Sequence, residues 1–437
     1  MTPTRCDAVI VGAGPAGSTA AILLARAGWS VVLVEKQEFP RRKVCGDCIA
    51  ASNFGLFDAL GLGDRFAALA GPALRRVALW QGSTRLMADL PPATDPHHPW
   101  GRALGREALD ALLLDQARSV GVRVMQPGMA LSLSGRAGDQ CLQVRNVESG
   151  EQQAVRAPIM ILAQGSGQHR LAAPAAARRV RSGSDLLAFK ANFQGAQLED
   201  GLLPVLGFVG GYGGLVVAEQ GVTTLACCIR ADRLDALRRA SPRQTAGEVV
   251  EAMLKRDCVG VAQALHGAQR DGAWLAAGPL APGWHGRRGE APFCIGNAAG
   301  EAHPIIGEGM SMAMQSAWLL CQHLLQADRP TGRRTTPAEA SRWQADVQRR
   351  YQAEWRRHFL PRLRLAAAFA HLAMRPALAG PLLALLQRWP GLLAWGAQRV
   401  TRWGGKLDCA ADPGAVTRLA DAAANRRASP ARALAMP

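Results

Sequence analysis

The first 35 residues alternate between apolar runs and a segment with helical spacing. Ala8–Val11 is a continuous apolar run, apolar residues then recur at helical spacing from residue 20 to 27, and a second run covers Val31–Val34. Short continuous runs are typical of strands buried on both faces, and the middle segment is typical of a helix. The order predicts a strand–helix–strand unit with parallel strands.

Three later segments repeat these patterns. Residues 100–125 place Leu109, Leu112 and Leu113 on one helical face, and the run "PIMILAQGSG" is an apolar strand that ends in a turn at Gly165. From residue 293 a short strand, a glycine-rich loop and a long helix follow. After about residue 335 the pattern is helical, with breaks predicted at Pro361, Pro376, Pro381 and Pro390.

The turn after the first strand carries the most specific local motif. It reads Gly12-x-Gly14-x-x-Gly17, and the second strand ends at Glu35. Gly12 permits a tight turn, Gly14 lets the backbone approach a pyrophosphate, and Gly17 lets helix and strand pack closely. The helix N-terminus attracts phosphate, and an acid at the position of Glu35 accepts hydrogen bonds from a ribose. FAD or NAD fits this site, whereas an acid there disfavours the 2′-phosphate of NADP.

Composition narrows the class of protein without naming its chemistry. The chain has 437 residues and a net charge of +17, which comes almost entirely from arginine and is typical of a GC-rich genome. The arginines are dispersed and no nucleic-acid-binding motif occurs, so no nucleic-acid partner is expected. No secretory signal and no run of about 18 uncharged apolar residues occur. Together with ten scattered cysteines, this predicts reduced thiols and a cytoplasmic protein.

In combination, these motifs resemble those of the FAD-dependent para-hydroxybenzoate hydroxylase superfamily over roughly residues 5 to 330. That superfamily includes aromatic hydroxylases, flavin halogenases and geranylgeranyl reductases. The resemblance implies FAD as the cofactor, Arg106 as a cofactor contact, and glycines before the last long helix that lie against the flavin. The residues expected to bind FAD are Gly12, Gly14, Ala16, Gly17, Glu35, Lys36, Cys45, Gly46, Arg106, Gly296, Asn297, Pro304, Gly307, Gly309 and Met310.

The chain departs from the family pattern in the loop "GNAAGEAHP", where Asn297 stands at the usual position of an aspartate. An amide can still bond a ribityl hydroxyl, so FAD binding is expected to survive. The turn "AQGS" also lacks the aspartate that commonly follows Ala163.

Cys45 and Cys48 form a C-x-x-C spacing in "KVCGDC". Cys45 matches a family loop that passes over the flavin, and Gly46 would permit close backbone approach. A zinc site needs two more ligands, and no second C-x-x-C or paired-histidine motif exists. A redox dithiol needs a thioredoxin-like unit, which is not evident. The sequence therefore predicts a flavin loop and no metal, with a working dithiol as the alternative.

The resemblance leaves several chemistries open. The preferred hypothesis is a monooxygenase that hydroxylates an aromatic, polyketide or phenolic-lipid substrate with NAD(P)H and O₂ through a flavin C4a-hydroperoxide. The first alternative is a geranylgeranyl reductase-like enzyme acting on isoprenoid double bonds, although the W-x-F-P part of that family's strand is missing here. A halogenase with Lys190 as its lysine is also considered, although no W-x-W motif occurs and a lysine in "LLAFKANF" is more typical of a strand edge. A non-catalytic maturation partner of another protein is the remaining alternative.

Tyr212 and His303 are the polar residues expected to face the substrate. Tyr212 lies among glycines in a strand that should line the site, and His303 precedes Pro304 in the flavin loop. The tyrosine hydroxyl can bond a phenol or carbonyl, and the histidine can position substrate or relay a proton.

The expected fold is α/β. It has a discontinuous Rossmann-like FAD domain (1–75, 100–180 and 285–335), an inserted β-sheet substrate domain (76–99 and 181–284) and a C-terminal helical region with a flexible tail (336–437). NAD(P)H is expected as a transient reductant, since only one dinucleotide motif is present. The apolar helices flanked by Arg and Trp fit a peripheral contact with the inner membrane face, a cap over the pocket, or core packing. A monomer or a homodimer is expected.

Overall fold

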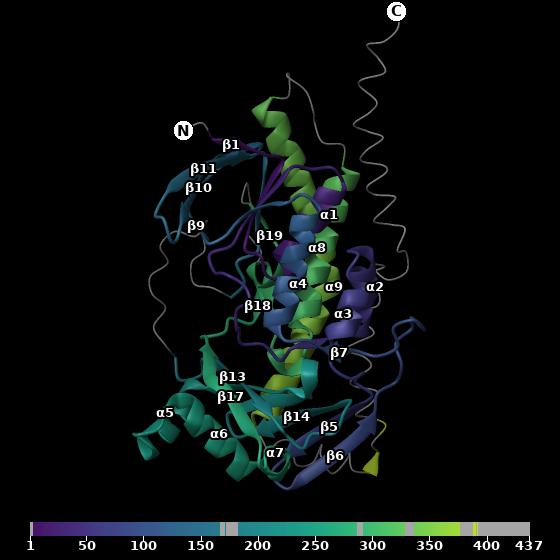
Figure 1. Cartoon of the computed structure of the whole chain (residues 1–437), viewed down its shortest axis with the longest axis vertical. Coiled ribbons are helices and arrows are strands. Elements are labelled where there is room, and N and C mark those ends of the chain that lie inside the picture. Colours follow the sequence, from purple (N-terminus) through teal and green to yellow (C-terminus); the bar gives the residue numbers. More distant parts are fainter. Residues whose placement is uncertain are drawn as a thin grey trace, which may run out of the picture.

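The computed structural model describes residues 3–166, 171, 182–285, 292–327, 336–375, 388, 389 and 391. Figure 1 shows two lobes, and a long helix runs down the middle of this view from the upper lobe to the lower one. The upper lobe contains a parallel sheet and the N-terminal helix, and the lower lobe contains a large, mostly antiparallel sheet. The predicted α/β class is confirmed.

The upper lobe is built on a parallel sheet. Its order is β19 (Phe293–Cys294), β12 (Ile159–Leu162), β2 (Ala8–Val11), β3 (Val31–Val34) and β8 (Arg123–Met125). Ile10 lies opposite both Leu33 and Ile161 in parallel register. The strand–helix–strand unit predicted from the first 35 residues is therefore confirmed.

Both faces of the parallel sheet are buried, as continuous apolar runs require. Ala8 and Ile10 of β2 belong to a core formed with α1 (Pro15–Arg26), α4 (Arg106–Ser119) and α8 (Gly309–Gln326). Val9 and Val11 point the other way, because side chains alternate along a strand. They pack against a second sheet of β1 (Thr4–Arg5), β11 (Gln152–Ala157), β10 (Asp139–Asn146) and β9 (Gly128–Arg136).

The lower lobe contains a seven-stranded sheet. Its order is β17 (Gln269–Ala277), β13 (Leu186–Gln194), β16 (Thr223–Arg230), β15 (Gly211–Val217), β14 (Leu202–Phe208), β5 (Arg76–Gln81) and β6 (Thr84–Asp89). One face carries Phe189, Phe193 and Leu225 against α5 (Ala231–Ala240), α6 (Ala246–Asp257) and α7 (Val259–Ala264). The opposite face is turned toward the upper lobe, where it meets a cavity.

The remaining elements before residue 337 are short. They are β4 (Cys48–Ile49) paired with β7 (Arg102–Ala103), β18 (Gly283–Trp284) paired with β20 (Gly300–Glu301), α2 (Phe54–Ala59), α3 (Gly63–Leu69), and the 3-10 turns η1 (Ala51–Asn53), η2 (Glu219–Gly221), η3 (Gly296–Ala298) and η4 (Pro304–Ile306).

Helix α9 (Pro337–Ala373) corrects one prediction. The expected break at Pro361 is wrong, because the helix continues through this proline. Proline removes one backbone donor and disturbs one turn, and tertiary packing offsets that cost here. Trp355 and Phe359, on the turns just before it, are buried against the upper lobe. The breaks predicted at Pro376, Pro381 and Pro390, and the predicted tail, lie outside the described residues.

Candidate FAD site and adjoining cavity

The turn between β2 and α1 forms one end of a groove. Gly12 has a φ of +105°, and a side chain there would lie 2.5 Å from the carbonyl oxygen of Ala163. A Cβ on Gly17 would lie 1.8 Å from the carbonyl oxygen of Gly12, so helix and strand can approach only as glycine allows. Gly14 precedes the helix without a side-chain cap, which leaves N–H groups of the first turn for an anion.

Glu35 closes this end of the groove. It is buried, and its carboxylate accepts hydrogen bonds from the backbone N–H groups of Ala13 at 2.9 Å and Gln37 at 3.0 Å. These two bonds hold the carboxylate against the glycine turn. Each carboxylate oxygen retains lone pairs, so a ribose hydroxyl can still donate to it.

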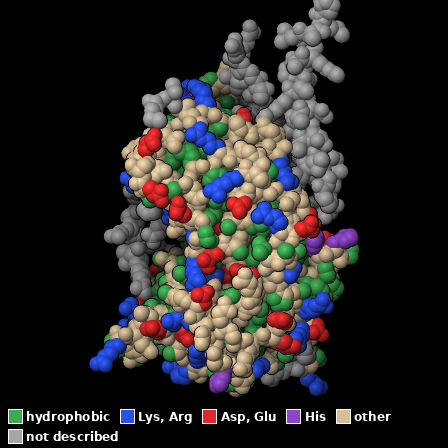
Figure 2. Space-filling view, viewed as in Figure 1, with side chains coloured by type: hydrophobic (Ala, Val, Ile, Leu, Met, Phe, Trp, Pro, Cys, Tyr) green, Lys and Arg blue, Asp and Glu red, His purple; other side chains and the backbone are tan. Residues whose placement is uncertain are grey.

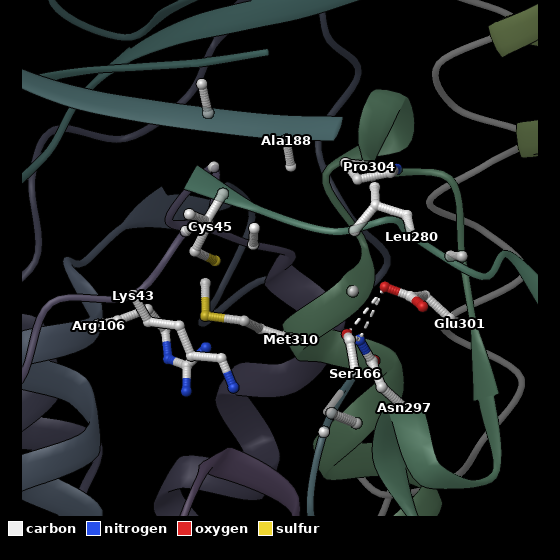
Figure 3. A pocket seen from close by; sticks show the side chains of 18 of the residues that line it. Lys43, Cys45, Arg106, Ser166, Ala188, Leu280, Asn297, Glu301, Pro304 and Met310 are labelled. Carbon is white, nitrogen blue, oxygen red and sulfur yellow. Dashed lines mark hydrogen bonds between the residues drawn. The ribbon is translucent and has the colours of Figure 1, made fainter. Parts of the chain in front are cut away.

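Three cationic side chains line the groove beside the glycine turn. Arg106 is buried and donates two hydrogen bonds to Asp110, at 2.8 and 2.7 Å, and Arg41 pairs with the same carboxylate at 3.3 Å. Lys43 points into the same space as Arg106 (Figure 3). Burial, followed by repulsion from Arg106 and Arg41, lowers the pKa of Lys43 to about 8. A pyrophosphate in the groove would relieve this repulsion.

The groove contains hollows where other residues would place a side chain. Among the described residues, nothing lies within 4 Å of a Cβ built on Gly46 or on Gly309, and only the Arg106 guanidinium approaches one on Gly14. These three glycines lie on the loop before β4, on α8 and before α1 respectively. Because they leave space along one continuous groove, the residues present fit an extended dinucleotide such as FAD.

The loop of residues 43–48 is anchored across the two lobes. Asp47 has a φ of +57° and is buried, and it accepts hydrogen bonds from Lys190 and, at 2.8 Å, from Thr224. Lys190 lies on β13 between β16 and β17 and is 4% exposed, so the prediction of a strand-edge lysine is wrong. An ion pair between Lys190 and Asp47 therefore joins β13 to this loop, and no pattern in the sequence indicates it.

Cys45 and Cys48 are both free thiols in this loop. Burial, followed by the charge of Asp47, raises the pKa of each. Buried thiols with raised pKa values are poor nucleophiles and poor metal ligands. No group of potential metal ligands occurs among the described residues. The arrangement agrees with a loop that borders the flavin.

A cavity of about 1480 Å³ runs from this groove to the seven-stranded sheet. Its far wall is apolar, with Leu79 of β5, Leu203 and Val205 of β14, and Phe369 and Leu372 near the end of α9. Among the predicted site residues, its lining includes Gly12, Gly14, Ala16, Glu35, Lys36, Cys45, Gly46, Arg106, Tyr212, Gly296, Asn297, Pro304, Gly307, Gly309 and Met310. Gly17 lies behind this wall in helix packing, and His303 lies behind Tyr212.

Tyr212 and His303 form a polar pair at the apolar end. The Tyr212 hydroxyl lies 3.2 Å from Nδ1 of His303, and both residues are buried. Burial, with a smaller effect from His371, lowers the pKa of His303 to about 4, so the imidazole is neutral at pH 7. Burial also raises the pKa of Tyr212. His371 on α9 is exposed, and its ring centre lies 6.1 Å from that of His303.

Sequence reasoning missed several residues that line this site. Lys43, Asp47, Ser166 and Glu301 all border the cavity. Lys43 follows two arginines in "RRK", a run of cations close to the ribose acid that indicates an anion site. No local signal indicates the other three, because their partners come from distant segments.

A family model described as "FAD binding domain" matches residues 5–348, most of the chain. The chain belongs to this FAD-binding family. FAD is therefore its cofactor, and the protein is an FAD-dependent oxidoreductase. Glu35, Arg106 and the glycine turn would hold the cofactor, which brings redox chemistry to the cavity.

Individual relatives differ in their chemistry. A menaquinone reductase of Mycolicibacterium smegmatis is 51% identical over 59 residues, which is 14% of each chain. The halogenase CndH from a myxobacterium has a TM-score of 0.67 at 20% identity, over 82% of both chains. PqsL of Pseudomonas aeruginosa, a probable FAD-dependent monooxygenase, has a TM-score of 0.63 at 19% identity, over 86% of this chain and 99% of PqsL. The chain spans less than a third of the length of the curated reductases and halogenase that it matches. The two structural neighbours share the fold.

A membrane-spanning helix needs about 20 consecutive residues and a mostly apolar composition. Among the described residues, no helix meets both requirements. On the face shown in Figure 2, basic side chains are dispersed among acidic and apolar ones.

Proposed function

We propose that this FAD-dependent oxidoreductase is a monooxygenase that hydroxylates a phenolic ring carrying a long apolar chain. The observation that carries this proposal is the Tyr212–His303 pair, a buried hydrogen-bonded pair of which Tyr212 lines the mostly apolar wall of the substrate end and His303 lies behind it. An apolar chain fits the surrounding wall, and a ring hydroxyl fits the polar pair.

The pair suits a phenol because it can take up and pass on a proton. A substrate hydroxyl that donates to the oxygen of Tyr212 allows Tyr212 to donate to Nδ1 of His303, which is neutral at pH 7. Exposed His371, whose ring centre lies 6.1 Å from that of His303, would offer the proton a route toward solvent. Loss of the phenol proton makes the ring more electron-rich, which favours attack by an electrophilic oxygen.

FAD, when bound and reduced, supplies the activation of O₂. NAD(P)H, as a transient reductant, provides two electrons. One oxygen atom enters the ring, the ring hydrogen is released as a proton, and the other oxygen leaves as water. The chain's own contribution is to hold the ring in place and to keep water out through the apolar wall.

The experiment uses a long-chain alkylphenol and, as its control, an alkylbenzene with the same chain and no hydroxyl. Purified holoprotein is given NAD(P)H and ¹⁸O₂. We expect the phenol alone to accelerate NAD(P)H oxidation and to gain one ¹⁸O atom. NAD(P)H oxidation without ¹⁸O in any phenolic product would reject the proposal.

A second candidate is reduction of an isoprenoid double bond. It is favoured by the apolar lining of the cavity and by the match to a menaquinone reductase. Reduction of an isolated alkene has no use for a phenol-binding pair. Anaerobic consumption of NAD(P)H with a menaquinone, and gain of two hydrogens in its side chain, would establish this candidate instead.

A halogenase would need a lysine that reaches a small oxidant in the cavity. Lys190 cannot take this role, because its ammonium group donates a hydrogen bond to Asp47 and Lys190 does not line the cavity. A maturation role toward another protein gains no support from the described surface.

A lipid-like substrate also supports peripheral membrane contact. Phe369 and Leu372 of α9 line the cavity, whereas the outward face of this helix carries exposed arginines. Anionic lipids attract such a basic face. We therefore include a weak, salt-sensitive contact between α9 and anionic membranes in the proposed function.

A further inference from the structure

Three polar side chains meet on the wall of the FAD groove, beside η3 (Figure 3). The hydroxyl of Ser166 lies 2.9 Å from Oε1 of Glu301, and Nδ2 of Asn297 lies 2.7 Å from the same hydroxyl. Glu301 is 5% exposed, and its other oxygen accepts the backbone N–H of Ala281 at 3.1 Å. Ser166 and Asn297 are less buried and border the groove.

The direction of each hydrogen bond in this cluster is fixed by the carboxylate. Glu301 only accepts, so the single hydroxyl hydrogen of Ser166 must be donated to it. The oxygen of Ser166 can then only accept from its neighbour, which selects the NH₂ end of Asn297. The carbonyl Oδ1 of Asn297 is thereby left as the atom that can face the groove.

We propose that Glu301 is a positioning residue for FAD. By fixing the orientation of Asn297, it presents an acceptor, Oδ1, to a hydroxyl of the cofactor. A ribityl hydroxyl can donate to this atom, whereas a phosphate oxygen cannot. The carboxylate acts through Ser166 and the amide of Asn297, although Glu301 also borders the cavity.

The same geometry gives a reason for an amide at position 297. Nδ2 of Asn297 lies 3.5 Å from Oε1 of Glu301. An aspartate there would place two carboxylates side by side, with one hydroxyl hydrogen of Ser166 to serve both. Repulsion between like charges at this distance disfavours such a pair.

The chain of hydrogen bonds through residues 301, 166 and 297 should also form with donors and acceptors exchanged. With glutamine at 301, the side-chain oxygen can keep the bond from Ala281 while the NH₂ group donates to Ser166. The hydroxyl of Ser166 is then free to donate to an aspartate at 297. The double variant N297D/E301Q therefore restores one consistent chain of donors, whereas N297D alone does not.

The test measures FAD binding to apoprotein by quenching of flavin fluorescence, without substrate or turnover. We expect N297D to raise the Kd for FAD by about tenfold or more, since it replaces a satisfied bond by a charge conflict. N297D/E301Q should return the Kd to within about threefold of the parent. E301Q alone should have a small effect, because the amide of Asn297 can flip and a hydroxyl can also accept.

The result that overturns the proposal is a double variant that binds FAD no better than N297D, or an N297D protein that binds as tightly as the parent. The melting temperature of each apoprotein is recorded alongside. If N297D alone fails to fold, the same coupling predicts that E301Q restores a folded, FAD-binding protein, and continued misfolding of the double variant rejects it. The readout is independent of the reaction catalysed, so failure of the proposed hydroxylation leaves this test unchanged.

Discussion

The two ends of the cavity are built in different ways. The FAD groove is formed by backbone: glycine turns, two helix N-termini and a carboxylate held by N–H groups. The substrate end is formed by apolar side chains of β5, β14 and α9, with one buried polar pair. Each part of the first arrangement is set by a short stretch of sequence, whereas the second depends on single side chains from segments that meet only in the folded chain. Substitutions at the two ends should therefore have different effects on stability, FAD binding and turnover.

The largest effect is expected at Gly17 in the FAD groove, where a substitution should disturb both helix packing and cofactor binding. Gly17→Ala places a methyl group against the carbonyl oxygen of Gly12, where there is no room. We expect about 3 kcal/mol of lost stability in the apoprotein and, in addition, complete loss of FAD binding, so the combined effect exceeds that of every later change. Gly14→Ala is the matched control, since its methyl group enters the open groove. It should weaken FAD binding while leaving apoprotein stability nearly unchanged, as measured by urea unfolding and flavin content.

The second effect concerns the ion pair between Lys190 and Asp47, which links the lower-lobe sheet to the loop beside the FAD groove. Lys190→Met leaves the carboxylate of Asp47 buried without its cation. Breaking a buried pair from one side costs roughly 3–5 kcal/mol. The double variant Lys190→Met/Asp47→Asn should recover much of this loss, because no charge remains buried.

An exposed pair on α6 provides the comparison. Lys255 bonds Glu251 at 2.8 Å from a partly exposed position. Lys255→Met should cost less than about 1 kcal/mol, as exposed pairs do. If Lys190→Met and Lys255→Met lower the free energy of unfolding equally in denaturant, the buried Lys190–Asp47 pair does not stabilise the contact between the two lobes.

The contrast between the two ends also explains what the sequence could predict. The parallel strands and the glycine turn were predicted because each uses a local pattern, such as Gly12-x-Gly14-x-x-Gly17 before a helix. Lys190 was misplaced because its position inside the sheet depends on the order of β13 among seven strands. Its partner Asp47 lies 143 residues away.

The continuity of α9 was missed for a similar reason. A proline at 361 indicates a break when only local geometry is considered. Burial of Trp355 and Phe359 against the upper lobe stabilises the continuous helix, and this packing cannot be inferred from the sequence.

Tyr212 and His303 were identified as residue types suited to the site. Their mutual hydrogen bond emerged only from the fold.

The third effect belongs to the substrate end and appears as acid sensitivity. The pKa of His303 is about 4 in the folded protein and 6.5 in an unfolded chain. The folded state therefore binds fewer protons, so this stability is present above pH 6.5 and is lost as the pH falls toward 4. The limit is about 3 kcal/mol at 1.36 kcal/mol per pH unit. His303→Gln should unfold with a weaker pH dependence over this range; an unchanged profile would argue against a buried neutral imidazole.

The fourth effect tests the polar pair in turnover. Tyr212→Phe keeps the ring and removes the hydroxyl that reaches His303. We expect kcat to fall about a hundredfold, as for loss of a proton-transfer group, with flavin content unchanged. Tyr351 is the control, because the chain has two tyrosines and this one is buried in the upper lobe, with its hydroxyl on the carbonyl oxygen of Cys294.

Tyr351→Phe should leave turnover unchanged while lowering stability slightly. His303→Ala should resemble Tyr212→Phe in turnover. If Tyr212→Phe and His303→Ala both turn over like the parent with full flavin, the pair has no part in the reaction.

The smallest effect concerns access to the substrate end from a membrane. Arg356 and Arg357 are exposed on α9, on the helix whose last turns reach the cavity. Each arginine near an anionic lipid surface contributes about 1 kcal/mol, so Arg356→Gln with Arg357→Gln should reduce binding to phosphatidylglycerol vesicles at low salt by up to about thirtyfold. The matched control replaces Arg238 and Arg239, exposed on α5 in the lower lobe, by glutamine. Equal losses in both pairs would indicate attraction by net charge alone, and no vesicle binding by the parent would show that the substrate end is not filled from a membrane.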